Sequence, residues 1–212
     1  DGSADSVVSS SSRGPTDDGR IKPDLVAPGQ TVTSTKSSLT GSGFYTTLSG
    51  TSMATPLAAG IAALVRQDLV QNKKISNPSA ALIKGLLING AVPLPGHDFP
   101  STISGWGRIN LTNTLLPPGN NYIDFVDETA GVETNDENNY TYIVSTSQPL
   151  KITLVWTDAA QSSPNTVPNI VNDLHLQVIS PTGAVFNGND FSAPFNNDTD
   201  ILNNVEQVLI PT

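Results

Sequence analysis

The stretch LSGTSMATP (residues 48–56) places a serine in a tight, glycine-bearing turn directly before a long run of small apolar residues. From Ala54 to Val70 the sequence is rich in Ala, Leu, Ile and Val, and it carries little charge until Arg66 and Asp68. This pattern predicts a helix that is buried on most of its surface. Pro56 falls in the first turn, where a missing N–H costs nothing. The sequence therefore predicts a hydroxyl group at the mouth of a buried helix.

Ser52 is the candidate functional residue of this turn. A serine at a helix N-terminus lies near unpaired backbone N–H donors and near the positive end of the helix dipole. Negative charge that develops on an oxygen bound there is stabilised, which suits a nucleophile. The residues alone leave a second interpretation open, in which Gly50-Thr51-Ser52 is only a helix cap before an apolar stretch.

Two further segments accompany this motif in the sequence. They are SSRGP (residues 11–15), followed by GRIKPDLVAPG (residues 19–29), and GWGRIN (residues 105–110). The three segments, in this order, resemble the subtilisin-like serine peptidases, whose nucleophile lies in a Gly-Thr-Ser-Met-Ala-Ser/Thr-Pro motif that opens a central helix. The resemblance covers about residues 1–117. It implies an α/β fold, the C-terminal part of a subtilisin-like three-layer domain.

The resemblance also implies roles for three residues of the turn. Ser52 would attack the scissile carbonyl, and its own backbone N–H would supply one donor to the oxyanion. Thr51 would lend its hydroxyl as a weaker donor. Gly50 would permit a tight turn that a side chain would obstruct.

The partners that such a serine needs are not found in this sequence. A serine nucleophile requires a base and a carboxylate that orients the base, and in this family both precede the serine, in the order Asp, His, Ser. His97 and His175 both follow Ser52, and neither has the family's His-Gly-Thr context. We expect His97 in an exposed loop and His175 on the outward face of a strand. The triad Asp and His and the oxyanion-hole Asn are thus expected in a missing N-terminal half, and these residues alone are expected to be inactive.

The character of the sequence changes near residue 118. Residues 1–117 form the expected peptidase-like unit, with a buried strand at 25–27 and a second helix at 80–89, and residues 118–121 form a Pro/Gly/Asn linker. Residues 122–212 read as an all-β unit of short runs separated by Asn, Gly, Pro and Ser clusters. The expected strands are 122–126, 139–145, 150–157, 173–180, 184–186 and 205–210.

The second unit has the pattern of a β-sandwich. Ile152, Leu154 and Trp156 alternate along one face, and residues 181–183 supply a hairpin turn. The stretches LVWTD (154–158), VNDL (171–174) and GNDF (188–191) resemble the jelly-roll domain that follows the catalytic domain in one branch of subtilisin-like alkaline peptidases. We therefore expect a jelly-roll sandwich, truncated at its C-terminus.

This unit is rich in oxygen ligands at strand ends and in loops, which suits a hard cation. No EF-hand spacing is present, so solvated loop acids remain the alternative. Resemblance implies structural calcium, because jelly-roll domains of that branch bind it. Our first choices of ligand are Asp158, Asp173 and Glu206.

Charge and hydropathy narrow the partners. The formal net charge of −9 disfavours nucleic acid and fits a cation-binding surface better. The longest apolar stretch carries Arg66 and is too short to span a bilayer. The resemblance implies a secreted or cell-surface serine endopeptidase that acts on peptides or proteins through an acyl-enzyme on Ser52. The alternative is a non-catalytic scaffold that carries a calcium- or glycan-binding sandwich.

Overall fold

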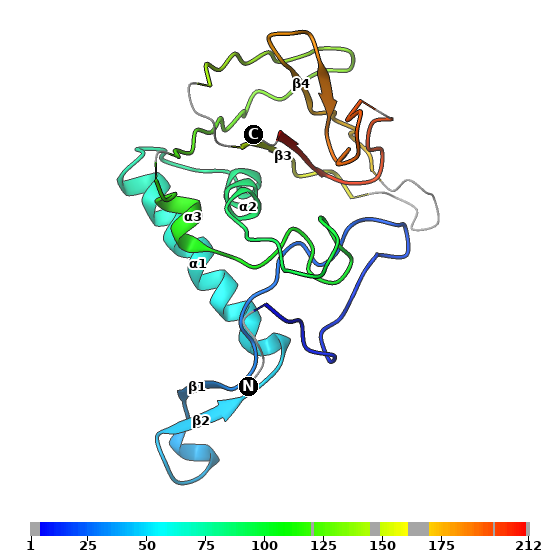
Figure 1. The fold of residues 1–212 in the computed structure, drawn as a ribbon. Helices are drawn as coiled ribbons and strands as arrows, with labels where there is room; N and C mark the ends of the chain where they lie inside the picture. The colour runs from blue at the N-terminus through cyan, green and yellow to red at the C-terminus, as the bar shows by residue number, and fades with distance from the viewer. Residues whose placement is uncertain (1–4, 120, 145–148, 161–169, 197, 211–212) are drawn as a thin grey trace.

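The computed structural model of the chain describes residues 5–119, 121–144, 149–160, 170–196 and 198–210. A hairpin precedes the helices, and the strands of the C-terminal part follow them (Figure 1). The elements in order are β1 (Val32–Thr35), the 3-10 helix η1 (Ser38–Thr40), β2 (Tyr45–Leu48), α1 (Thr51–Gln71), α2 (Ala80–Asn89), α3 (Leu111–Leu115), β3 (Leu150–Val155), β4 (Gln177–Ile179), β5 (Val185–Asn187) and β6 (Val205–Ile210).

The helix predicted after the serine turn is α1, but its burial differs from the prediction. Among its described residues only Val65 and Leu69 are buried, whereas Leu57 and Leu64 are 42% and 47% exposed. The prediction of burial on most of the surface is therefore wrong for the described chain. The physical reason is that α1 packs against α2 and α3, which leaves its other faces in solvent.

The second helix has the bounds predicted from its sequence, Ala80–Asn89. Ser79 is its N-cap, and the Ser79 hydroxyl accepts a hydrogen bond from the Leu82 N–H. This cap satisfies one of the free N–H groups of the first turn. Four apolar residues of α2 are buried, namely Leu82, Leu86, Leu87 and Ile88. The helix therefore forms the middle of the hydrophobic core.

The core joins the two units that the sequence predicts. One cluster links α1 and α2 through Val65, Leu69 and Leu86. A second cluster contains Ile88 and Trp106 from the first predicted unit and Val205 from the second. The two predicted units therefore pack directly against each other in the described chain.

Hydrogen bonds reinforce this contact between α2 and β3. The Asn89 side-chain amide donates to the Lys151 carbonyl at 3.2 Å and to the Thr153 hydroxyl at 3.0 Å. Lys151 Nζ returns a hydrogen bond to the Asn89 carbonyl at 3.0 Å. Burial lowers the pKa of Lys151. The end of α2 is thus fixed to a strand more than 60 residues further along the chain.

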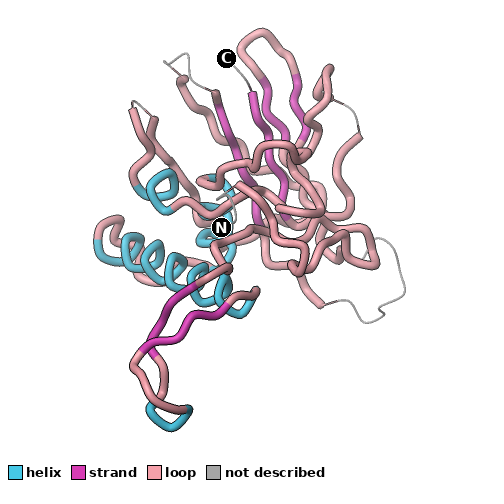
Figure 2. Tube along the Cα trace, turned by 60° about the horizontal axis from the view of Figure 1, so that its bottom comes forward, coloured by secondary structure: helices cyan, strands magenta, loops and turns pink. Residues whose placement is uncertain are grey.

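The C-terminal part contains fewer strands than predicted. β3 pairs with β6 antiparallel, from Leu150 opposite Ile210 to Val155 opposite Val205, and β4 pairs with β5 (Figure 2). The turn between β4 and β5 is the one predicted, with Gly183 at φ +84°. The described residues at 122–126 and 139–144 form no strand, because no neighbouring backbone completes a ladder with them. The described sheets have two strands each, and a jelly-roll sandwich is not evident in them.

Candidate active site

Ser52 lies in the first turn of α1, where the sequence predicted it. Gly50 is the residue before the helix, and its φ of +149° is a conformation that favours glycine. The N–H groups of Met53 and Ala54 both donate to the Gly50 carbonyl. Among the described residues, the N–H groups of Thr51 and Ser52 have no acceptor, as expected for the first residues of a helix. The site therefore presents two backbone donors beside Ser52.

The Ser52 side chain is accessible. Thr51 and Ser52 are both exposed, and the Ser52 hydroxyl has no hydrogen-bond partner in the part of the chain that the structure describes. The interpretation of Gly50-Thr51-Ser52 as a simple cap requires a side-chain cap bond, and the Gly50 position supplies none. Thr55 instead donates its hydroxyl to the Thr51 carbonyl at 2.9 Å. Ser52 is thus free to react with a bound molecule.

The loop before the β1–β2 hairpin supports the serine turn from below. The Gly50 N–H donates to the Gly29 carbonyl at 2.7 Å, and a Cβ on Gly29 would lie 2.6 Å from the Gly50 oxygen. The Thr31 N–H donates to the Ser49 hydroxyl at 2.8 Å, with Thr31 held at φ +55°. Sequence reasoning did not assign this role to Gly29. The signal available was the glycine of the LVAPG segment, which marks a close backbone approach.

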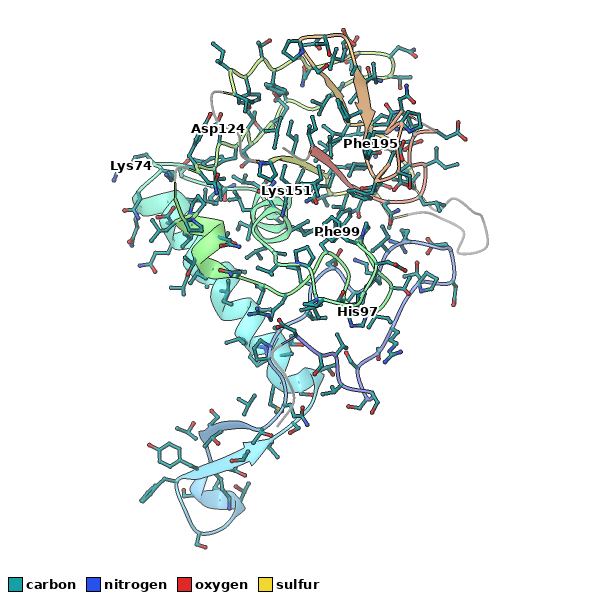
Figure 3. The ribbon with its side chains drawn as sticks, viewed as in Figure 1. Lys74, His97, Phe99, Asp124, Lys151 and Phe195 are labelled. Atoms are coloured by element: carbon teal, nitrogen blue, oxygen red, sulfur yellow. The ribbon has the colours of Figure 1, made fainter. Side chains whose placement is uncertain are left out.

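Neither histidine acts on Ser52 in the described chain. His97 lies in the loop that follows α2, as predicted, but it is half-buried rather than exposed (Figure 3). His175 precedes β4, and its side chain is 42% exposed. Its Nε2 lies 3.8 Å from Asp173 Oδ2, and its Nδ1 lies 3.7 Å from Glu206 Oε1. The structure therefore associates His175 with carboxylates of the C-terminal part.

The three predicted calcium ligands have different surroundings. The Asp158 carboxylate accepts hydrogen bonds from the Val171 N–H at 2.7 Å and from the Asn172 N–H at 2.9 Å. Burial raises the pKa of Asp158, but these hydrogen bonds outweigh it and hold the pKa below its ordinary value. Asp173 and Glu206 lie on the two sides of His175. Within the described residues no group of three His, Cys, Asp or Glu side chains could hold a metal ion, and the calcium site stays a prediction.

Glu206 is a buried carboxyl group in strand β6. It is 1% exposed, its Oε2 accepts the Leu176 N–H at 2.6 Å, and its Oε1 has no hydrogen-bond partner among the described residues. Burial raises the pKa of Glu206 to about 8, and the negative charges of Asp200 and Asp173 raise it further. A Cβ on Gly188 would clash with this carboxyl group. The glycine at 188 therefore makes room for Glu206.

No described helix is both long and apolar enough to cross a membrane. Comparison with known proteins places the serine turn in a family. The subtilase family matches residues 2–107, which is half of the chain. This matched region contains Gly29, Gly50 and Ser52, the residues that shape the site.

Individual relatives carry the same description. A serine protease/ABC transporter B family protein, tagA, of Dictyostelium discoideum is 32% identical over 93% of this chain and 13% of its own length. The serine protease AprX of Bacillus subtilis (strain 168) is 42% identical over 52% of this chain and 26% of its own length. Pyrolysin of Pyrococcus furiosus is 37% identical over 49% of this chain and 8% of its own length. The chain thus spans about a quarter or less of each of these relatives, and by its matched half it belongs to the subtilase family.

Proposed function

We propose that the protein is a serine endopeptidase in which Ser52 attacks the carbonyl carbon of a peptide bond. The observation that carries the proposal is the exposed Ser52 hydroxyl in the first turn of α1, beside the free N–H groups of Thr51 and Ser52. Relatives named as serine proteases support it. The substrates would be peptides or proteins.

The chemistry follows from this placement. When Ser52 Oγ forms a bond to the carbonyl carbon, the carbonyl oxygen becomes an oxyanion, and the free N–H groups together with the helix dipole stabilise its charge. The proton of the hydroxyl passes to a base, and the base then protonates the leaving amine. Water hydrolyses the resulting acyl-enzyme by the same steps in reverse order.

The base must come from outside the described part of this chain. We propose that an upstream segment supplies the histidine, its carboxylate and the oxyanion-hole asparagine. The apolar residues that α1 leaves exposed, Leu57 and Leu64, support this proposal, because a packed neighbour would remove them from water. The same segment would complete the burial of α1 that its composition predicts.

The test is active-site labelling of the full-length protein with a fluorophosphonate probe. We expect the probe to attach to Ser52, and we expect Ser52→Ala to abolish both labelling and peptide cleavage. Ser38→Ala is the matched control, because Ser38 is an exposed serine in the adjacent hairpin, and it should label normally. A folded full-length protein that does not react, or that reacts at another residue, would support the non-catalytic scaffold instead.

A further inference from the structure

The β1–β2 hairpin projects away from the rest of the chain in both views (Figures 1 and 2). Its strands pair from Val32 opposite Leu48 to Thr35 opposite Tyr45. The Lys36 N–H donates to the Phe44 carbonyl at 2.8 Å, which extends the ladder by one residue. The short η1 turn then closes the end of the hairpin. The hairpin therefore presents its end to whatever surrounds the molecule.

Three large apolar side chains gather at this end, and we refer to Leu39, Phe44 and Tyr45 as the hairpin tip. They are 94%, 84% and 69% exposed. Exposed apolar groups that lie together usually mark an interaction surface. The tip is therefore a candidate for contact with an apolar partner.

The tip is apolar on both faces of the hairpin. Side chains alternate along a strand, so Phe44 and Tyr45 point to opposite faces. The hydroxyl groups of Thr33 and Thr47, on the same face as Tyr45, lie 2.8 Å apart across the strands. Leu39 lies in the turn between the strands. A folded protein that docks on one face would leave the apolar groups of the other face in water, whereas a lipid interface surrounds both.

The charge distribution favours the same partner. The chain has 19 Asp and Glu residues, yet residues 25–67 contain none of them. Lys36 is the basic residue nearest the tip, and its Nζ already donates to the Ser42 carbonyl. Behind the tip the side chains are small hydroxyls, among them Ser34 and Thr46. No carboxylate would have to lose its water if the tip entered a medium of low dielectric.

We propose that the hairpin tip inserts into the interfacial layer of a lipid bilayer, with the acidic body of the protein remaining in water. Leu39 and Phe44 enter the apolar boundary, and the Tyr45 hydroxyl stays at the level of the headgroups. Insertion is shallow, since the open edges of a two-stranded hairpin need water or headgroups as hydrogen-bond partners. Binding is therefore reversible and scales with the apolar area that is buried.

Co-sedimentation of the full-length protein with phosphatidylcholine vesicles tests this proposal. We expect the double variant Leu39→Ser/Phe44→Ser to reduce the partition coefficient by about tenfold or more. The matched control is Leu116→Ser/Ile143→Ser, which removes two apolar side chains that are 76% and 88% exposed outside the hairpin. The control should bind like the wild type. Absence of wild-type binding, or an equal loss in both double variants, would overturn the proposal.

Tryptophan fluorescence locates the contact. Trp106 and Trp156 are 1% and 9% exposed, so vesicles should leave their emission unchanged. A Phe44→Trp variant should show a blue shift when phosphatidylcholine vesicles are added. Unchanged emission of this variant in the presence of vesicles would refute insertion. A dimer that dissociates in the Leu39→Ser/Phe44→Ser variant would also overturn the proposal, because the tip would then contact a second copy. None of these measurements depends on the activity of Ser52.

Discussion

Gly29→Ala is expected to displace the serine turn without touching the nucleophile itself. The new Cβ would lie 2.6 Å from the Gly50 carbonyl oxygen and 3.1 Å from the Ala54 Cβ, whereas ordinary contacts begin at 3.4 Å. The Gly50 oxygen must therefore move by the difference, about 0.8 Å. Because that oxygen accepts the first hydrogen bonds of α1, the movement should be transmitted to Ser52.

A displacement of this size has a large effect on a preorganised site. Misplacement of reacting groups by about 1 Å can reduce the rate about a hundredfold. If the protein is the peptidase proposed above, we expect Gly29→Ala to lower kcat/KM by about that factor, mainly through kcat. The measurements are peptide hydrolysis and the rate of fluorophosphonate labelling at Ser52, both on full-length protein.

Gly60→Ala is the matched control on the same helix. A Cβ at Gly60 meets nothing within 4 Å among the described residues, and alanine is the better helix former by about 1 kcal/mol. We expect this variant to raise the melting temperature and to leave the labelling rate unchanged. If Gly29→Ala reacts as fast as the wild type, the contact with Gly50 does not position Ser52 and the reasoning is refuted.

Two further predictions concern stability. Asp127→Ala removes the carboxylate that accepts hydrogen bonds from the Ser79 N–H at 2.8 Å and the Ser79 hydroxyl at 2.5 Å, so it should lower the free energy of unfolding in urea by about 1–3 kcal/mol; an unchanged midpoint would show that solvent replaces it. Lys84→Met removes a cation whose Nζ lies 3.0 Å from Asp24 Oδ1. Burial raises the pKa of Asp24, but Lys84 and Lys22 outweigh it and hold the pKa below 3.8. The pair therefore stabilises the fold above that pH, by less than about 1 kcal/mol, and the difference between Lys84→Met and wild type should disappear as the pH falls and Asp24 is protonated; a difference that persists in urea denaturation at low pH would contradict this.

Local signals predicted the helices and the serine turn well. Ser79 caps α2 through its own side chain, and the bounds of that helix follow from residues within one turn of its ends. Gly50 adopts a conformation that other residues rarely take, so the turn before Ser52 is also encoded locally. The strands β3 and β6 and the turn at Gly183 could be recognised for the same reason.

The sequence by itself thus determined the position of Ser52 at the start of a helix and the places where the chain bends. Only the tertiary structure decided which backbone segments pair, which is why residues 122–126 form no strand despite their composition. It also decided that Ile88, Trp106 and Val205 share one cluster across the predicted boundary, and that Gly29 supports Gly50. Burial, strand pairing and close backbone contact depend on residues far apart in the chain, and local pattern carries no information about those distances.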